Sequence, residues 1–388
     1  MKDFEFYSPT KIIFGKQGIS KLKAEVELYG QKVLLVYGGG SIKRNGIYNQ
    51  IKNALASFTV YELSGVTPNP RIETVRKGVS ICKENQIECI VAVGGGSTID
   101  CSKAIAAGTY YEKDPWDLII DPKKIQKALP ILDVLTISAT GSETNNTGVI
   151  SNLEKHLKLG FSSDCLYPKV AILNPEFTYT VPAFQTASGA ADTLSHLFES
   201  YFNDDYTSMV HQSMMEGVMK TVIHYAPIAL EQPENYEARA NLMWSATMAL
   251  NGLFKKAFSC GWSCHAMEHT LSAYYDVTHG AGLAVLTPAW MEYVLDEKSQ
   301  PRFVEFAKNV WGLSGDDEKT LAKAGIEKTK EFLFEILQLP STLQELGVEQ
   351  EKLEEMADNA VYAKGKGSIQ GFRTLTKEDV LAIYKACY

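Results

Sequence analysis

The strongest constraint on the fold is a glycine-rich turn that occurs twice, each time between an apolar run and a helical pattern. The apolar run at residues 32–37 ends in Gly-Gly-Gly-Ser, and a helical pattern follows at 42–57. The run at 88–93 ends in the same four residues, with a helical pattern at 98–107. Repeated succession of strand, tight turn and helix builds a parallel sheet that helices cover on both faces. The first half of the chain is therefore predicted to be α/β.

The remaining patterns divide the chain in two. Strands are also predicted at 58–63, 132–137 and 169–173, with a helix at 71–85 and a hairpin at 147–160. Beyond residue 182 apolar residues recur at helical spacing, in segments 183–202, 207–230, 233–252, 303–313, 319–337, 342–362 and 376–386. We predict a Rossmann-like α/β dinucleotide-binding domain at residues 1–181 and an all-helical, metal-binding domain at residues 182–388.

Composition narrows the class of protein. The 388 residues suggest two domains, and the net charge of −8 argues against a nucleic-acid or anionic-membrane partner. No apolar run approaches the length of a membrane span, and the N-terminus has no apolar signal core. Seven cysteines, an odd number without a Cys-x-x-Cys pair, fit free thiols in a reducing cytoplasm.

One segment concentrates residues that bind metals. Asp192 and His196 are four apart, so a helix places them on one face. Three of the seven histidines, His265, His269 and His279, follow within a short window. A lone Asp-x-x-x-His pair is more often a hydrogen bond on a helix face, but the additional imidazoles favour a metal centre. One carboxylate with several imidazoles suits Zn²⁺ or Fe²⁺.

Two other metal sites are alternatives. His265-x-x-Glu268-His269 matches the inverted zinc-protease motif, in which a glutamate activates a metal-bound water. That interpretation leaves the glycine-rich turns and Asp192 unexplained. A purely structural zinc site is disfavoured, because such sites usually have cysteine-rich shells.

The glycine-rich turns indicate a second ligand. Neither turn matches G-x-G-x-x-G, the usual dinucleotide fingerprint. Each nevertheless brings backbone N–H groups and a helix N-terminus to the end of a strand, where an anion is favoured. Thr136 and Thr140 lie at and just beyond the end of the strand predicted at 132–137. Together the three segments predict a phosphate-bearing cofactor along the strand ends.

These motifs resemble a known family over nearly the whole chain. The matching segments are residues 14–15, 94–100, 140–143, 174–175, 192–196 and 261–280, and they resemble the iron-containing, or group III, alcohol dehydrogenases, in particular the butanol dehydrogenase-like branch. The resemblance implies an active site in the cleft between an α/β and a helical domain. It also implies metal-dependent hydride transfer between a nicotinamide and a small primary alcohol or aldehyde, such as butanol or butanal.

The resemblance also implies roles for single residues. One divalent ion, Fe²⁺ or Zn²⁺, would be bound by Asp192, His196, His265 and His279. His269 would lie beside the metal as a catalytic residue, whereas Glu268 is expected to point away and to matter little. The cofactor-binding residues implied are Gly38, Gly39, Gly40, Ser41, Gly94, Gly95, Gly96, Ser97, Asp100, Thr136, Thr140, Asn145 and Lys158.

Charge favours NADP(H) over NAD(H), which remains the alternative cofactor. Relatives that prefer NAD place an aspartate after the first strand, where this chain has Gly39, Gly40 and Ser41. No carboxylate would therefore repel a 2′-phosphate, and Lys43 and Arg44 could add positive potential, although both suit a solvated helix face. The resemblance further implies a homodimer formed through the α/β half.

A lyase similar to dehydroquinate synthase is a second alternative with a related fold. Such lyases normally use a glutamate as the acidic metal ligand and several Lys and Arg residues for a phosphorylated substrate. Here the acidic residue of the first motif is Asp192, and the segments 192–196 and 261–280 contain no Lys or Arg. Apolar residues near the metal, including Trp262 and Phe254, and residues around Asn251, are expected to line a pocket for a small aldehyde. The sequence does not identify the physiological substrate.

Overall fold

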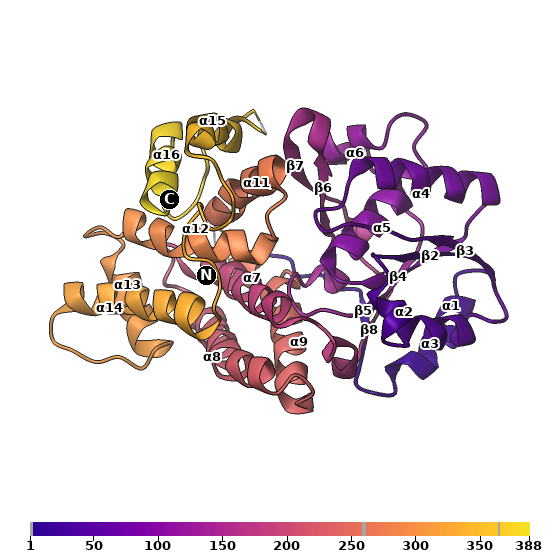
Figure 1. Ribbon diagram of the computed structural model, residues 1–388, viewed down its shortest axis with the longest axis horizontal. Helices are drawn as coiled ribbons and strands as arrows, with labels where there is room; N and C mark the ends of the chain where they lie inside the picture. The colour runs from indigo at the N-terminus through magenta and orange to yellow at the C-terminus, as the bar shows by residue number, and fades with distance from the viewer. Residues whose placement is uncertain (1–2, 258–260, 364) are drawn as a thin grey trace. The chain divides into compact units, whose positions relative to one another are not determined.

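The computed structural model describes residues 3–257, 261–363 and 365–388 (Figure 1). Its contacts group the chain into two compact units. The α/β unit comprises Tyr7–Val181 and Pro233–Thr247, and the helical unit comprises Met1–Phe6, Pro182–Gln232 and Met248–Tyr388. Among the described residues, no helix combines the length and apolarity that crossing a membrane requires.

The α/β unit is built on a six-stranded sheet in which every neighbouring pair is parallel. The strand order is β1-β8-β5-β4-β2-β3, with bounds β1 (Lys11–Phe14), β2 (Lys32–Tyr37), β3 (Thr59–Leu63), β4 (Cys89–Gly94), β5 (Ile131–Leu135) and β8 (Val170–Leu173). Helices α1 (Leu22–Glu27), α2 (Ser41–Arg44) and α3 (Ile47–Ala54) cover one face, and α4 (Ile72–Asn85) and α5 (Gly96–Gly108) cover the other (Figure 1). The predicted parallel α/β fold is confirmed.

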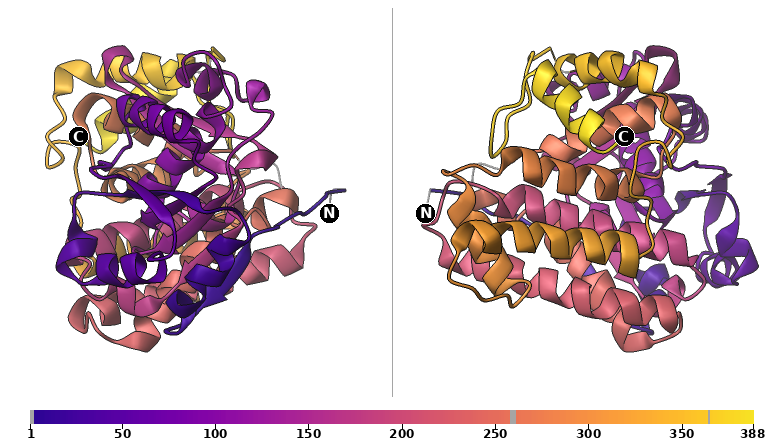
Figure 2. Two further views of the ribbon diagram at one scale, coloured as in Figure 1. Left: turned by 90° about the vertical axis from the view of Figure 1, so that its right-hand side faces the viewer. Right: turned by 60° about the vertical axis from the view of Figure 1, so that its left-hand side comes forward.

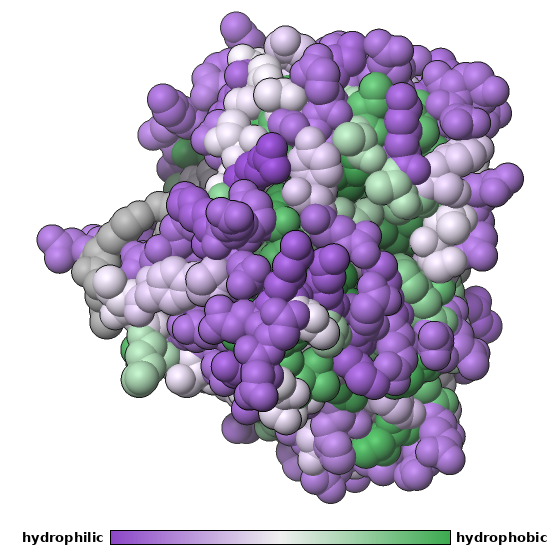
Figure 3. All heavy atoms as spheres, turned by 90° about the vertical axis from the view of Figure 1, so that its left-hand side faces the viewer, coloured by the Kyte–Doolittle hydropathy of each residue, from purple (hydrophilic) through white to green (hydrophobic). Residues whose placement is uncertain are grey.

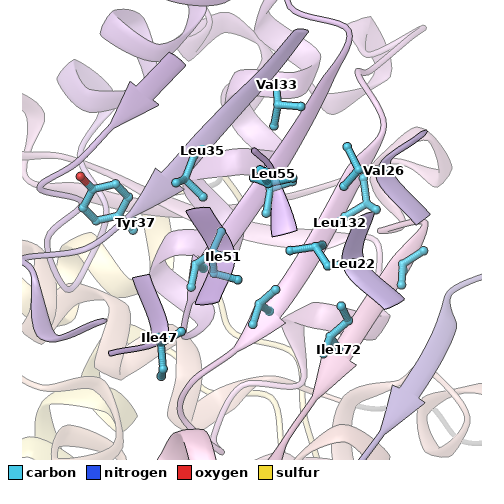
Figure 4. Packing of buried hydrophobic residues seen from close by; sticks show 14 of the residues in the cluster. Leu22, Val26, Val33, Leu35, Tyr37, Ile47, Ile51, Leu55, Leu132 and Ile172 are labelled. Carbon is cyan, nitrogen blue, oxygen red and sulfur yellow. The ribbon is translucent and has the colours of Figure 1, made fainter. Parts of the chain in front are cut away.

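Burial explains why these strands are nearly continuous apolar runs. β4 and β5 are buried along their whole length, as expected where helices cover both faces of a parallel sheet. On the face of α1 to α3, side chains from the strands and helices form one core, as Figure 4 shows for Val33, Leu35, Leu132, Ile51 and Leu55. This core fixes the strand ends, at which the glycine-rich turns begin.

Some predicted elements differ in detail. The single helix expected at 42–57 is two short helices, because Gly46 takes a left-handed φ of 82° between them. Strand β1 was not predicted, since four residues give too short a pattern. The hairpin expected at 147–160 is present as β6 (Thr147–Asn152) and β7 (Leu157–Ser162). A short helix, α6 (Trp116–Ile120), was also not predicted.

The helical unit packs long helices side by side, as the right-hand view of Figure 2 shows. Its helices are α7 (Ala183–Tyr201), α8 (Met209–Glu231), α10 (Phe254–Ala257), α11 (Ser263–Tyr275), α12 (His279–Val294), α13 (Gln300–Asn309), α14 (Glu318–Lys330), α15 (Leu353–Tyr362) and α16 (Lys377–Ala386). α12 packs against α7 and α11, and α13 against α14. The predicted helical second half is confirmed, although residues 342–349 do not form the helix expected there and Gln350–Lys352 form a 3-10 helix before α15. The face in Figure 3 is mostly hydrophilic, with scattered hydrophobic side chains.

Helix α9 (Tyr236–Leu250) belongs mainly to the α/β unit, although it lies among helices of the other unit in the sequence. Its Met243 is fully buried against Ala92 and Leu135 in the core on one face of the sheet. The Thr247 hydroxyl donates a 2.6 Å hydrogen bond to the buried carboxylate of Glu143. The chain therefore enters the α/β unit twice.

Candidate active site

The predicted metal ligands converge within the helical unit. Oδ1 of Asp192 lies 3.5 Å from Nε2 of His196, 3.9 Å from Nε2 of His265 and 3.7 Å from Nε2 of His279. Ligand atoms of Asp192, His265 and His279 all lie within 4.8 Å of one another. Four ligands at about 2.1 Å from a tetrahedral ion would lie roughly 3.4 Å apart, so this spacing fits a metal ion.

Three helices bring these side chains together. Asp192 and His196 lie one turn apart on α7, His265 is in the first turn of α11, and His279 is the first residue of α12. Gly280 lets α12 approach α7, because a Cβ there would lie only 1.9 Å from the carbonyl oxygen of Ser188. A side chain at that position would push His279 away from Asp192.

The chemistry of the donor atoms also fits a cation. Oδ1 of Asp192 and Nε2 of His265 are buried without a hydrogen-bond partner, which is costly unless an ion satisfies them. Burial lowers the pKa of His196 to about 3, against the opposing effect of Asp192, so its imidazole is neutral. Neutral imidazoles and a carboxylate are the form that binds Zn²⁺ or Fe²⁺.

A buried glutamate that the sequence analysis missed contacts this cluster. Glu199 lies one turn beyond His196 on α7 and is 3% exposed. It accepts hydrogen bonds from the backbone N–H groups of Ser263 (2.8 Å) and His265 (3.0 Å), and its Oε1 lies 3.3 Å from Nδ1 of His265. The sequence signal for Glu199 was its spacing: Asp192, His196 and Glu199 stand at positions i, i+4 and i+7, which share one face of a helix.

The prediction that Glu268 points away is wrong. Glu268 is fully buried, and its Oε2 contacts Nδ1 of His279 while its Oε1 accepts a hydrogen bond from Ser272. The reason is helical spacing, since residues three apart share a face and Glu268 follows His265 by three. Ligand atoms of Glu268, His269 and His279 also lie within 4.8 Å of one another, a second group that could hold a cation. The inverted zinc-protease motif needs a glutamate that activates water, whereas this carboxylate contacts His279 and Ser272, which disfavours that interpretation.

Aromatic rings and His269 surround the cluster. The Trp262 ring packs edge-on against His265 and His196, with centroids 5.0 and 6.1 Å away. The His269 ring lies 6.4 Å from that of His265 and 5.7 Å from that of His279, and is partly exposed. Phe254, expected to line a pocket, is 2% exposed. Asn251 accepts a hydrogen bond from the Leu253 backbone.

In the α/β unit, one glycine-rich turn joins β4 to α5. Gly94 ends β4, Gly95 caps α5 and Gly96 is its first residue, followed by Ser97. A Cβ on Gly95 would lie 2.1 Å from Ile137, and one on Gly96 2.4 Å from the Thr140 hydroxyl. The glycines therefore allow the residues after β5 to pack directly on the helix N-terminus.

Thr136 and Thr140 meet this same turn. The Thr136 N–H donates to the carbonyl oxygen of Gly94 at 3.0 Å, and the Thr140 hydroxyl accepts from Ser142 N at 3.2 Å. Both threonines are half-buried. The structure thus brings together three predicted cofactor segments of this half: the turn and the two threonines.

The other turn follows β2 and is more open. Gly39 and Ser41 are exposed, and a Cβ on Gly39 would meet no atom within 4 Å. The backbone at position 40 has a φ of 102°, which glycine adopts at no steric cost. The ammonium of Lys43 lies over the rings of Tyr37 and Tyr48, at 5.1 and 4.8 Å. Gly38 leads from the end of β2 into the turn.

Asp100, Asn145 and Lys158 instead form bonds and charge interactions within the unit. Asp100 accepts hydrogen bonds from Ser142 and from the Val149 backbone, tying α5 to the β6–β7 hairpin. Burial raises its pKa, against the opposing charges of Lys103 and Lys158. Asn145 accepts from the Lys103 ammonium at 3.1 Å and donates to Gly141. Lys103, fully buried, was missed by the sequence analysis.

The strand order locates the natural ligand position of the sheet. β3 lies on one side of β2 and β4 on the other, so the chain reverses direction across the sheet between β2 and β4. Ligands of open parallel sheets bind beyond the carboxyl ends of strands at such a point. Both Gly-Gly-Gly-Ser turns follow these two strands.

Comparisons with known proteins agree with this geometry. The family model described as iron-containing alcohol dehydrogenase matches residues 9–175, and that of the C-terminal region of the Fe-containing alcohol dehydrogenase family matches residues 186–388. NADH-dependent butanol dehydrogenase A of Clostridium acetobutylicum is 50% identical over 391 residues, which cover 100% of both chains. The NADPH-dependent aldehyde reductase YqhD of Escherichia coli is 37% identical over 90% of each chain.

Solved structures show the same fold. The crystal structure of NADH-dependent butanol dehydrogenase A from Thermotoga maritima superposes with a TM-score of 0.95, at 42% identity, over 100% of this chain and 99% of that one. Membership of this family implies a nicotinamide cofactor and a divalent metal. The chain therefore belongs to the iron-containing alcohol dehydrogenase family, in the branch that resembles the butanol dehydrogenases, and is an NAD(P)-dependent alcohol dehydrogenase.

Proposed function

We propose that this enzyme transfers hydride between NADP(H) and a small primary alcohol or aldehyde at one divalent ion, Fe²⁺ or Zn²⁺. The observation that carries the proposal is the buried Oδ1 of Asp192, which has no hydrogen-bond partner and faces three imidazole Nε2 atoms. Substrates of the butanol or butanal type are supported by the names of relatives that are butanol dehydrogenases or an aldehyde reductase.

Asp192, His196, His265 and His279 would bind the ion. When bound, the ion would act as a Lewis acid on a substrate oxygen, and the nicotinamide would carry the hydride. The apolar Trp262 ring packs edge-on against His196 and His265, and an apolar neighbour lowers the local dielectric and strengthens electrostatic interactions there. His269 has a partly exposed ring close to the cluster, which suits orientation of the substrate or proton relay.

The cofactor would bind at the two Gly-Gly-Gly-Ser turns. α5 is long enough for its N-terminal N–H groups to attract a diphosphate, and Thr140 lies beside that terminus. The charge argument and the names of the relatives favour different cofactors, NADP(H) and NAD(H) respectively, which differ in the 2′-phosphate. The open turn at Gly39, where the chain has no aspartate, supports NADP(H), whereas four relatives that are 43–50% identical are named NADH-dependent or probable NADH-dependent enzymes.

The test is reduction of butanal by metal-free protein to which Fe²⁺ or Zn²⁺ is added back. The absorbance of the reduced cofactor, NADPH, should fall for wild type only when metal is present. It should not fall for Asp192→Ala, whose circular dichroism spectrum should match that of wild type. Elemental analysis of the same samples should give one ion per wild-type chain and none in Asp192→Ala. Full turnover by a metal-free sample would overturn the proposal.

The six described cysteines, all free thiols, support a reducing, cytoplasmic location.

A further inference from the structure

Of the predicted ligands, His279 has the most exposed side chain. That side chain is 23% exposed, compared with 4% for His196 and 8% for His265. His279 is also the first residue of α12, where neighbouring turns restrain a side chain least. An imidazole in this position needs a fixed partner if its Nε2 is to stay directed at Asp192.

Glu268 provides that partner from α11. One carboxylate oxygen contacts Nδ1 of His279, and the other accepts a hydrogen bond from the Ser272 hydroxyl. The same hydroxyl oxygen lies 3.1 Å from the carbonyl oxygen of Val277, a second acceptor for its one proton. Gly282 leaves room for this carboxylate, since a Cβ there would lie 3.0 Å from Glu268 Cγ.

Glu199 holds His265 differently. Its two oxygens accept hydrogen bonds from the backbone at the start of α11 and so hold that helix to α7. The contact with Nδ1 of His265, at 3.3 Å, comes in addition to these bonds. The Glu268 carboxylate instead contacts two side chains, the Ser272 hydroxyl and the His279 ring. Loss of its charge should therefore act on His279 more than on the fold.

We propose that Glu268 is a positioning residue that accepts the Nδ1 proton of His279, fixes the tautomer with Nε2 free, and thereby tightens metal binding. An imidazole that binds through Nε2 keeps its proton on Nδ1, and a charged acceptor makes it a better ligand. This inference rests on the proposed metal centre. Removal of such an outer partner typically weakens metal binding by about 10–100-fold.

The test uses Glu268→Gln, which preserves shape and removes the charge, and Co²⁺ as the probe. Co²⁺ affinity is measured by competition with a chelator, and the ligand field by visible absorption. Proton NMR of the Co²⁺ protein reports the exchangeable imidazole N–H groups separately. We expect binding about 10–100-fold weaker, with one shifted N–H signal displaced and the others retained.

Glu216→Gln is the matched control. Glu216 is also a buried glutamate of the helical unit, but it accepts hydrogen bonds from Tyr201 and Asn309 instead of a histidine. The control should bind Co²⁺ as wild type does. If Glu268→Gln does not fold, Ser272→Ala removes the other bond of the carboxylate and should displace the same N–H signal with a smaller loss of affinity.

The outcomes separate this inference from the proposed function. Wild-type affinity and an unchanged N–H signal in Glu268→Gln, or in Ser272→Ala where that variant replaces it, would overturn the role of Glu268 alone. If instead wild type and Asp192→Ala bind Co²⁺ equally, the metal centre itself is wrong and both proposals fall.

Discussion

The buried carboxyl group of Asp133 is expected to lower the free energy of unfolding of the enzyme. It lies in the middle of the central strand β5, is 0% exposed, and neither carboxylate oxygen has a hydrogen-bond partner. The charge of the nearby Lys103 opposes this cost, but its ammonium donates its hydrogen bonds to oxygens of Ser142, Asn145 and Thr147. A buried polar group without a partner costs about 1–3 kcal/mol. Near pH 4, where the carboxyl is protonated in the folded and the unfolded state, Asp133→Val should therefore raise the free energy of unfolding by that amount.

The effect should depend on pH with a definite sign. Burial raises the pKa of Asp133 well above its ordinary value of 3.8. The folded protein then keeps a proton that the unfolded chain has lost, so stability falls as pH rises from about 4 through the folded pKa. Within that window the loss is about 1.4 kcal/mol per pH unit. Below pH 4 both states are protonated and this contribution disappears.

Two variants separate the two effects. Asp133→Asn keeps a buried polar group but cannot titrate, whereas Asp133→Val removes polarity as well. Urea unfolding of metal-free protein, followed by circular dichroism between pH 5 and 9, gives each free energy. The difference between Asp133→Asn and wild type should grow with pH, and Asp133→Val should exceed Asp133→Asn by a constant amount. A less stable Asp133→Val at pH 8 would refute the reasoning and show that an ionised Asp133 compensates Lys103.

Three further predictions concern the proposed function. His269→Ala should retain its metal by elemental analysis, with turnover lower by up to about 10²–10⁴-fold, because its ring lies beside the proposed ligands; loss of metal would make it a ligand. Gly39→Asp should shift the ratio of kcat/KM values from NADPH towards NADH by tenfold or more, about 1.4 kcal/mol, and a wild-type preference for NADH would contradict the charge argument. Light scattering at micromolar concentration should report a homodimer, and a monomer would contradict the assembly that the family resemblance implies.

Periodicity was enough to predict the layered architecture, because strands buried on both faces leave uninterrupted apolar runs and helices leave a period near 3.6. It could not predict β1, whose four residues carry too little pattern, or the break at Gly46, which depends on one backbone angle. Residues 233–252 were predicted as a helix, but nothing in their pattern reveals that α9 packs on the sheet.

The proposed ligands could be named from motifs, whereas their partners could not. The roles of Glu199 and Glu268 depend on how three helices meet, and a sequence shows only which residues share a face of one helix. Glu268 adjoins His269 in the sequence but follows the proposed ligand His265 by three residues, so it shares a helix face with that ligand. The sequence gives no sign that Lys103 is buried, because the oxygen atoms that accept hydrogen bonds from its ammonium come from residues about 40 positions away in the chain.

The double entry of the chain into the α/β unit has a consequence for truncated proteins. A fragment that ends at Val181 would lack α9, so the sheet residues under Met243 would face water and Glu143 would lose the hydroxyl of Thr247. Such a fragment should be prone to aggregation through that exposed face. Cutting at the apparent midpoint of the sequence would thus yield an incomplete nucleotide-binding half, and a working minimal version would need α9 appended through a new linker.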